Sequence, residues 1–262
     1  MDLSIIIVSW NTKELLKKCL DSIYNNQADL SLEIIVADNN SSDGTAKMVE
    51  AHFPKVKLMA NDKNLGFAAA NNQALIIAHG QYVLFLNPDT EIINDGLKKS
   101  VEFMKQNQDC GALGPRLLFA DKSLQPSVRR WPTFWPIFLM LIKAPKIFKD
   151  LKAIDHYLAR DFDYSKLQEV DQIMGAYLMV PRTIFSKVGF FDQRFFIWFE
   201  EVDFCLRIKR AGLKVIYNPQ IEVIHHGGAS FAQEALVKKQ WQFFKSALRY
   251  FLKNGFFYQS KQ

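Results

Sequence analysis

Tyr82-Val-Leu-Phe-Leu-Asn-Pro-Asp-Thr-Glu91 is the stretch that decides the fold of this chain. Its first five residues have high strand propensity and almost no polarity, so they predict a strand buried within a sheet. Pro88 has no N–H to donate to a strand ladder, and the sheet is therefore expected to stop there. In parallel α/β sheets ligands bind outside the carboxyl ends of the strands. Asp89 is thus the first candidate for a metal or phosphate site, although Asn-Pro-Asp also suits an ordinary turn.

Around this stretch, predicted strands alternate with predicted helices, and the strands are expected at residues 3–9, 33–37, 56–60, 82–86 and 110–115. Asn11, with Glu14 three residues later, is expected to cap the first helix. Gly80 is expected to end the helix predicted over residues 67–78. This alternation predicts an α/β fold with a doubly wound, mainly parallel sheet.

Composition sets limits on the class of protein. The chain has 262 residues, of which 49% are hydrophobic and 23% charged, as in soluble globular proteins. Three widely spaced cysteines (Cys19, Cys110 and Cys205) suggest neither a disulfide framework nor a zinc site, which fits a reducing cytosol. There is no signal-peptide pattern, and no apolar run reaches the roughly 18 residues of a membrane span. We therefore expect a cytoplasmic protein.

The net charge of +6 suits a nucleic acid, an anionic bilayer or a phosphorylated substrate. Because the basic residues are scattered and no nucleic-acid-binding motif is present, we expect no nucleic-acid partner. Residues 117–171 break the regular alternation. They contain Arg129 and Arg130, then an apolar run over 131–142 that fits either contact with a membrane surface or a flap packed over the sheet. Residues 233–253 predict an amphipathic helix rich in basic and aromatic side chains.

Polar loops follow the first predicted strands. Ser9-Trp-Asn-Thr12 and Asp38-Asn-Asn-Ser-Ser-Asp-Gly44 each come directly after a strand, and Gly66 lies among small residues before a helix. Such loops can bind the hydroxyls or ring nitrogens of a nucleoside, and they are also good turns. Neither G-x-G-x-x-G nor G-x-x-x-x-G-K-[ST] occurs, which argues against dinucleotide oxidoreduction and P-loop hydrolysis.

Acidic and histidine residues supply two further candidate groups. Glu200, Glu201 and Asp203 begin a predicted helix among bulky apolar residues. The helix dipole alone favours acids there, whereas aromatic neighbours would desolvate a carboxylate and make it a usable general base. His225 and His226 precede two glycines and form either a ligand loop or a turn.

In their order along the chain, these motifs resemble family-2 glycosyltransferases of the GT-A fold, in particular the bacterial rhamnosyltransferase-like branch. The resemblance covers roughly residues 3–116 and 172–230. It rests on Ser4-Ile-Ile-Ile-Val-Ser-Trp-Asn11, Val36-Ala-Asp-Asn-Asn-Ser-Ser-Asp-Gly44, Asn64-Leu-Gly-Phe-Ala-Ala-Ala-Asn-Asn72 with Phe85-Leu-Asn-Pro-Asp-Thr90, and Gly189-Phe-Phe-Asp192 leading to Phe199-Glu-Glu-Val-Asp-Phe-Cys-Leu-Arg207.

The resemblance implies a domain over residues 1–230, followed by an amphipathic helical extension over 231–262. Within the domain it implies a Rossmann-like nucleotide-binding half (1–116), a variable segment (117–171) and a smaller catalytic and acceptor-binding half (172–230).

The implied activity is inverting transfer of a sugar, rhamnose or similar, from a dTDP- or UDP-sugar to a hydroxyl of a glycan or polyprenyl-diphosphate-linked acceptor. Such transfer serves cell-surface polysaccharide synthesis. The apolar run over 131–142 and the basic tail suit a peripheral protein at the inner face of the cytoplasmic membrane. The alternative is an inactive nucleotide-sugar-binding or scaffold protein.

The resemblance also implies residue roles. Asp89 and His225 would hold Mg²⁺ or Mn²⁺, and Glu201 would be the base, with Glu200 or Asp203 sharing that role. Apart from the resemblance, Arg129 and Arg130 either clamp a diphosphate of the donor or of a lipid-linked acceptor, since guanidinium pairs bidentately with phosphate, or are ordinary surface charges. The donor-binding residues would be Ser9, Trp10, Asn11, Asp38, Asn40, Gly66, Asn71 and Asn87. Two departures from the family pattern favour the inactive alternative: Asn87 replaces the first acid of Asp-x-Asp, and Glu201 replaces an aspartate.

Overall fold

The computed structural model describes residues 1–27, 29–143, 151–227 and 236–256. Its strands are β1 (Leu3–Ser9), β2 (Leu32–Asp38), β3 (Lys57–Ala60), β4 (Tyr82–Leu86), β5 (Thr90–Ile92), β6 (Cys110–Leu118), β7 (Leu124–Gln125), β8 (Val128–Arg129), β9 (Gln168–Glu169), β10 (Gln172–Ile173), β11 (Tyr177–Pro181) and β12 (Lys214–His225). Its helices are α1 (Lys13–Asn25), α2 (Thr45–His52), α3 (Phe67–Ile76), α4 (Gly96–Gln106), α5 (Phe134–Leu141), α6 (Lys152–Tyr157), α7 (Ile184–Val188), α8 (Glu200–Arg210) and α10 (Leu236–Asn254).

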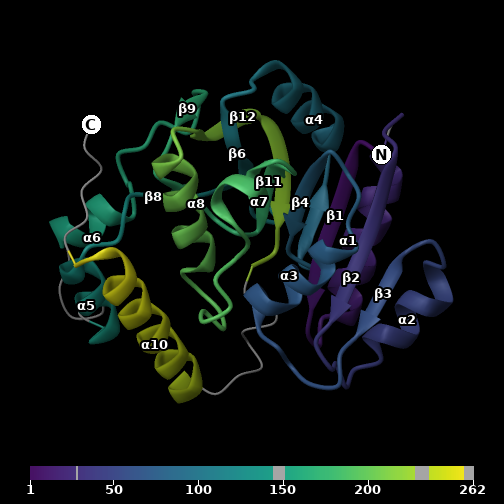
Figure 1. Cartoon of the computed structure of the whole chain (residues 1–262), viewed down its shortest axis with the longest axis horizontal. Helices are drawn as coiled ribbons and strands as arrows, with labels where there is room; N and C mark the ends of the chain where they lie inside the picture. Colours follow the sequence, from purple (N-terminus) through teal and green to yellow (C-terminus); the bar gives the residue numbers. More distant parts are fainter. Residues whose placement is uncertain (28, 144–150, 228–235, 257–262) are drawn as a thin grey trace.

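One large sheet organises the described residues, with the strand order β3-β2-β1-β4-β11-β6-β12-β5 (Figure 1). Strands β3, β2, β1 and β4 are parallel, and β6 is parallel to β12. β11 lies antiparallel between β4 and β6. The predicted α/β fold with a mainly parallel sheet is confirmed. Because Ser9 pairs with Asp38 and Ile7 with Leu86, the carboxyl ends of three strands meet at one edge.

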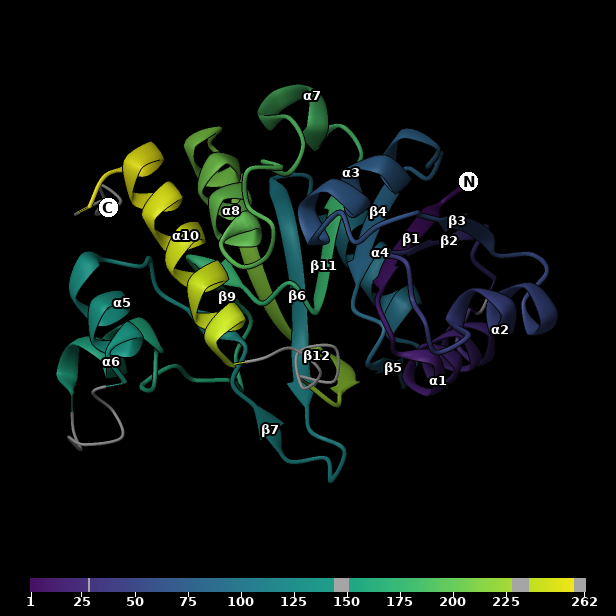
Figure 2. The same ribbon diagram turned by 90° about the horizontal axis from the view of Figure 1, so that it is seen from below.

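Helices cover both faces of this sheet (Figure 2). Ile5 and Ile7 pack in a core with residues of α1, α2 and α4, whereas Ile6 and Phe85 pack in a core with residues of α3 and α8. Successive residues of a strand point to opposite faces, so a strand covered on both sides must be apolar throughout. The continuous apolar runs in the sequence follow from this arrangement.

Two predicted helix boundaries are wrong. Asn11 does not cap α1: it has a φ of 51°, and its side-chain oxygen accepts a hydrogen bond from the Ser42 N–H at 2.7 Å. Gly80 does not end α3, whose last residue is Ile76. A Cβ on Gly80 would lie 2.3 Å from the Ser4 nitrogen, so glycine is needed there for close packing of the backbone.

The second half of the chain places α8 and α10 side by side and packs α5 against α6 and α10 (Figures 1 and 2). The Phe134 N–H donates to the carbonyl of Phe256 at 3.3 Å, which ties α5 to the end of α10. In the apolar run over 131–142, Ile137 is buried while Trp135 is exposed, so only one side of the run is covered. No helix in the described part of the chain is both long and apolar enough to cross a bilayer.

Candidate active site

A cavity of about 350 Å³ opens at the carboxyl ends of β1, β2 and β4. This volume is within the range of small-molecule sites, and strand ends of a parallel sheet are where such sites form. The polar and aromatic side chains at its wall include Trp10, Asn39, Asn64, Asn87, Asp89, Arg129, Tyr157, Gln172, Trp198, Glu200, Glu201, His225, Gln242 and Phe243.

Three of the proposed donor-binding residues line the cavity: Trp10, Gly66 and Asn87. Gly66 has a φ of 83°, and a Cβ there would lie 2.5 Å from the backbone oxygen of Phe196. Glycine therefore allows the loop before α3 to lie against the segment that leads into α8, which closes the cavity wall.

The other proposed donor-binding residues do not reach the cavity wall. Asp38 is buried and accepts hydrogen bonds from the N–H and the hydroxyl of Ser41. Ser9 and Asn71 are also buried: the Ser9 hydroxyl bonds that of Thr12, and the Asn71 amide donates to Phe67. Asn40 is exposed and has a φ of 63°. In this structure the side chains of Ser9 and Asp38 order the loops that follow β1 and β2, whereas that of Asn71 bonds within α3.

Asn39 is a cavity residue that the sequence interpretation missed. It is buried, and its side-chain amide donates to the Gly66 carbonyl at 3.2 Å and accepts from Asn61 at 3.1 Å. Because side chains alternate along β2 and just beyond it, Asn39 and Asp38 point to different sides. That alternation was the signal in the sequence that would have favoured Asn39 over Asn40 as a residue of the cavity wall.

Asp89 and His225 form a buried pair at one end of the cavity, with 3.3 Å between His225 Nε2 and Asp89 Oδ1. His225 Nδ1 lies 2.8 Å from Gln125 Oε1, and the Gln125 amide nitrogen faces the His225 carbonyl oxygen. Since Oε1 can only accept, this contact places a proton on Nδ1, and in the neutral imidazole the lone pair is then on Nε2. Nε2 has no hydrogen-bond partner among the described residues.

This pair fits a divalent cation. A carboxylate oxygen and an unprotonated imidazole nitrogen are suitable ligands for Mn²⁺ or Mg²⁺. No cluster of three or more His, Cys, Asp or Glu side chains that could hold a metal occurs among the residues described. These ions commonly use one or two protein ligands together with substrate phosphates and water, so Asp89 and His225 suffice as the protein's share.

Glu200 and Glu201 lie together at another part of the cavity wall. Burial raises the pKa of Glu200 well above its usual value, and the charge of Glu201 raises it further. Burial also raises the pKa of Glu201, while a hydrogen bond from Glu200 opposes that rise. Two carboxyl groups in one buried site do not readily ionise together, so the pair shares one proton. Because the pKa of Glu200 is raised more than that of Glu201, Glu200 is the group that would hold this proton and donate it to Glu201.

An unusual backbone segment aims this pair at the cavity. Trp198 and Phe199, directly before α8, have φ values of 63° and 69°. Left-handed backbone at a bulky residue costs about 1–3 kcal/mol and persists only where the surroundings impose it. Here α10 imposes it: the Phe199 ring contacts those of Phe243 and Tyr250, and the Ser246 hydroxyl donates to the Ile197 carbonyl at 2.8 Å.

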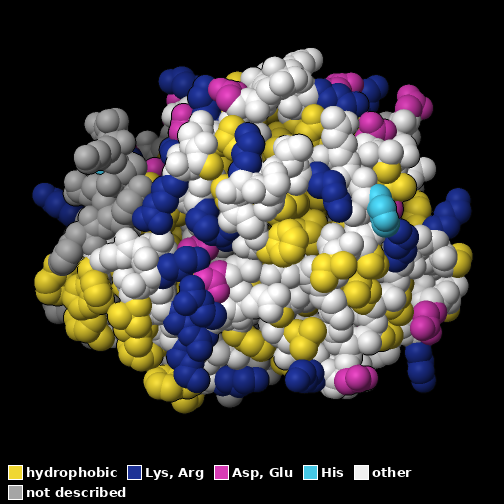
Figure 3. Space-filling view, viewed as in Figure 1, with side chains coloured by type: hydrophobic (Ala, Val, Ile, Leu, Met, Phe, Trp, Pro, Cys, Tyr) yellow, Lys and Arg dark blue, Asp and Glu magenta, His cyan; other side chains and the backbone are white. Residues whose placement is uncertain are grey.

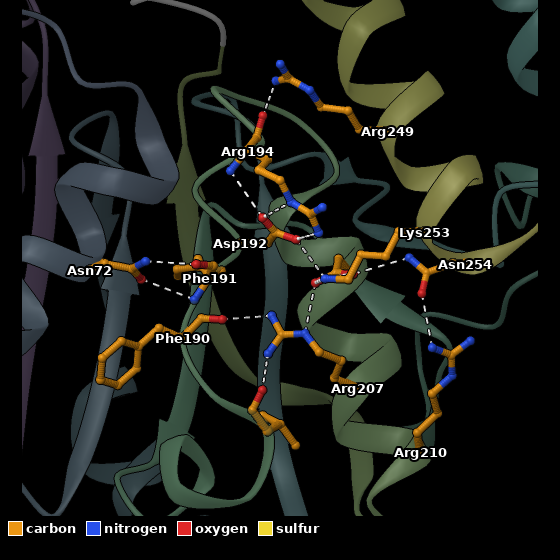
Figure 4. A network of polar contacts seen from close by, with 12 residues as sticks. Asn72, Phe190, Phe191, Asp192, Arg194, Arg207, Arg210, Arg249, Lys253 and Asn254 are labelled. Carbon is orange, nitrogen blue, oxygen red and sulfur yellow. Dashed lines mark hydrogen bonds and ion pairs between the residues drawn. The ribbon is translucent and has the colours of Figure 1, made fainter.

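Asp203 is not with the other two acids. It is fully buried, does not line the cavity, and accepts hydrogen bonds from Arg207, Lys253 and Asn254 at 2.8, 3.0 and 3.2 Å. Lys253 also bonds Asp192 at 2.8 Å (Figure 4). The contacts with Lys253 and Asn254 join α8 to α10, while Arg207 lies one turn further along α8, so the place of Asp203 in the structure is that of a strut between two helices and not of a base.

The two neighbouring arginines, Arg129 and Arg130, lie in different surroundings. Arg129 lines the cavity, whereas Arg130 forms an ion pair with Asp161 at 2.7 Å and does not. Tyr157, which the sequence interpretation missed, lines the cavity with Arg129 and Glu201. Burial raises the pKa of Tyr157 to about 12, with Arg129 opposing and Glu201 adding to the rise, so its hydroxyl keeps its proton.

Known structures share this architecture. GalNAc-T7 with UDP, GalNAc and Mn²⁺ superposes with a TM-score of 0.65 at 17% identity, over 86% of this chain and 44% of that one. The mannosyltransferase PcManGT from Pyrobaculum calidifontis, in complex with GDP-Man and Mn²⁺, gives 0.62 at 20% identity, over 94% of this chain and 64% of that one. The fold is therefore that of the GT-A glycosyltransferases.

Sequence comparison identifies the family. The family model for glycosyl transferase family 2 matches residues 4–166, and the chain belongs to that family. Rhamnosyltransferase WbbL of Escherichia coli is 31% identical over 262 residues, covering 94% of this chain and 91% of that protein. The N-acetylglucosaminyl-diphospho-decaprenol L-rhamnosyltransferase of Mycobacterium tuberculosis is 27% identical over 244 residues, covering 88% and 78%. The predicted family and its rhamnosyltransferase-like branch are confirmed.

Proposed function

We propose that this glycosyltransferase moves rhamnose or a similar sugar from a dTDP- or UDP-sugar to a hydroxyl of a glycan or polyprenyl-diphosphate-linked acceptor, with inversion at the anomeric carbon. The observation that carries this proposal is that the Asp89–His225 pair and the Glu200–Glu201 pair line one cavity. The names of the Escherichia coli and Mycobacterium tuberculosis relatives support rhamnose and a lipid-linked acceptor.

On the donor side, Trp10, Asn39 and Asn87 line the part of the cavity formed by the strand ends, where a nucleoside diphosphate would bind. Asp89 and His225 would hold the divalent cation, which neutralises the charge that develops on the leaving diphosphate when it is bound. Mn²⁺ in the two solved glycosyltransferases supports this assignment. Asn87 contributes a neutral amide where the family usually has an acid, so we expect the protein alone to bind the cation weakly.

On the acceptor side, Glu201 takes the proton of the attacking hydroxyl while the hydroxyl oxygen bonds the anomeric carbon and the bond to the diphosphate breaks. A single base opposite the leaving group favours one displacement and therefore inversion. Glu200 keeps its proton and orients Glu201 through their hydrogen bond. Arg129 provides a guanidinium that suits the phosphate of a lipid-linked acceptor.

A panel of UDP-, dTDP- and GDP-sugars tests this function. Calorimetry with Mn²⁺ identifies the donor, and NMR of the product formed on a polyprenyl-diphosphate glycan gives the anomeric configuration. Asp89→Ala should lose cation-dependent donor binding, whereas Asp62→Ala, at an exposed aspartate, should behave as the parent. Donor binding without transfer to any acceptor would support the inactive alternative. Activity of Asp89→Ala that persists in chelator would remove Asp89 from the cation site.

We further propose that the protein acts in the cytoplasm, at the inner face of the cytoplasmic membrane, because a polyprenyl-linked acceptor would be anchored there. The outer sides of α5 and α10 form the surface that would face the lipid.

A further inference from the structure

Helix α10 has three distinct sides. Its buried side includes Ala247, Tyr250 and Phe251, which pack into the core. A second side is exposed and apolar, with residues spaced by three or four positions as required for a single helix stripe. This stripe consists of Val237 (78% exposed), Trp241 (54%), Phe244 (40%), Leu248 (41%) and Leu252 (71%).

Helix α5 extends this apolar stripe. Trp135 is 59% exposed, Phe138 39% and Ile142 54%, again at helical spacing. The two helices are in contact, and the Phe134 and Phe256 rings lie 6.1 Å apart. We call the exposed apolar side chains of α5 and α10 the docking face. In Figure 3 hydrophobic side chains gather at the lower left, where Figure 1 shows these helices.

A basic third side of α10 borders the docking face. Residues 236–254 contain five Lys or Arg and no Asp or Glu. Lys245 and Arg249 are exposed on this side, and the Lys245 ammonium lies 5.0 Å from the centre of the Trp241 ring. Figure 3 shows Lys and Arg side chains next to the hydrophobic ones. An exposed apolar stripe flanked by cations is the pattern of a helix that lies in the surface of an anionic bilayer.

We propose that the docking face binds the surface of an anionic lipid bilayer, with the apolar side chains entering the headgroup region and the basic side contacting lipid phosphates. A second copy of the chain fits less well, because the basic sides of α10 would repel each other at a symmetric contact.

The position of the docking face connects it to the active site. Gln242 and Phe243 of α10 line the cavity, while Trp241 and Phe244, their immediate neighbours, are exposed. A bilayer at the docking face would therefore lie one helix away from the cavity. The significance of this orientation rests on the proposed function. Binding to lipid does not itself require sugar transfer.

Flotation with vesicles tests the proposal. The full chain is mixed at low salt with vesicles of phosphatidylcholine alone or with added phosphatidylglycerol. We expect flotation only with the anionic vesicles, and weaker flotation as salt is raised. The double variant Leu248→Glu/Leu252→Glu should lower the apparent partition coefficient at least about tenfold. Ile76→Glu on α3, at a side chain 73% exposed, is the matched control and should float as the parent.

Two further variants keep the test decisive if the double variant misfolds, which circular dichroism would show. Trp135→Glu on α5 and Lys245→Glu on α10 should each reduce flotation and leave thermal unfolding unchanged. The proposal is overturned if the parent chain stays unbound to anionic vesicles, or if these variants float as the parent does. It is also overturned if sedimentation shows a dimer that Leu248→Glu/Leu252→Glu dissociates. Donor binding, measured separately, reports on the proposed function.

Discussion

The hydrogen bond between Glu200 and Glu201 predicts how activity depends on pH. A base must be ionised to accept a proton, so transfer should increase with pH through the pKa of Glu201. The hydrogen bond from Glu200 keeps that pKa lower than burial alone would make it. Removing the donor in Glu200→Ala should therefore raise the pKa of Glu201 and move the acidic limb of the pH profile to higher pH.

The expected displacement of the limb follows from the strength of the bond. A hydrogen bond to a charged group contributes about 1.5–3 kcal/mol, and a change of one in pKa corresponds to about 1.4 kcal/mol. The acidic limb of Glu200→Ala should therefore move to higher pH by about 1–2. At a fixed pH below that limb, a displacement of the limb by about one to higher pH should lower activity about tenfold. Glu200→Gln is the matched control, because its amide can still donate to Glu201 and should leave the limb in place.

The assay is the initial rate of sugar transfer against pH for the parent and the three variants, Glu200→Ala, Glu200→Gln and Glu201→Gln. Above the acidic limb of the parent, Glu201→Gln should lose about 10²–10⁴ of the rate, and it should lack that limb, while donor binding persists. Full turnover in Glu201→Gln would falsify its role as the base. If Glu200→Gln is inactive and Glu201→Gln is active, Glu200 is the base and Glu201 is the residue that orients it.

Three further predictions concern positioning and stability. Gln125→Leu should weaken Mn²⁺ binding about 10–100-fold by calorimetry, because the proton on His225 Nδ1 loses its acceptor. Asp203→Ala should lower the free energy of unfolding in urea by about 3–5 kcal/mol, because it leaves the cations that Asp203 binds without their buried partner. Glu33 lies at the opposite edge of the sheet from the cavity: burial would raise its pKa, but hydrogen bonds from Lys57, Ser4 and the His79 N–H outweigh burial and hold the pKa at about 2. Glu33→Gln should therefore cost roughly 3 kcal/mol at neutral pH, a contribution that the parent has above pH 4.5 and loses as pH falls toward 2.

Each of these predictions has a control. Gln106→Leu, at an exposed glutamine, should bind Mn²⁺ as the parent does, and equal affinity in Gln125→Leu would contradict the tautomer argument. Asp203→Asn keeps the shape of the side chain, so a loss as large as that of Asp203→Ala would show that the charge matters. An unchanged urea midpoint in Asp203→Ala would refute the strut between α8 and α10. If the free energy of unfolding of Glu33→Gln falls below pH 4.5 as much as that of the parent does, carboxylates other than Glu33 cause that fall.

Local pattern in the sequence was sufficient for the parallel strands at the start of the chain. The buried runs at 3–9 and 82–86 predict strands because a strand covered on both faces must be apolar, and parallel strands bring their following loops together. Trp10 and Asp89 were predicted on that basis, and both line the cavity. The Cys110–Leu118 strand was predicted only as far as residue 115, because Pro115 and Arg116 interrupt its apolar run.

The rest of the site depends on contacts between distant residues, which periodicity does not show. Asp203 and Glu200 are alike in sequence context, but only the fold places Lys253 and Asn254 beside Asp203 and leaves Glu200 facing the cavity. Gln125 has no sequence feature that connects it with His225, 100 residues away. Gln242 and Phe243 were interpreted only as part of an amphipathic helix, since a sequence pattern does not tell which surface a helix covers.

The bracing of Trp198 and Phe199 by α10 has a consequence for how the enzyme is made. Residues 236–254 leave the ribosome after the acids at 200 and 201, so a nascent chain that already contains both acids still lacks the helix that orients them. If the two acids act as proposed, a nascent chain without α10 would carry them without turnover, and catalysis would begin only once α10 has folded against the segment before α8.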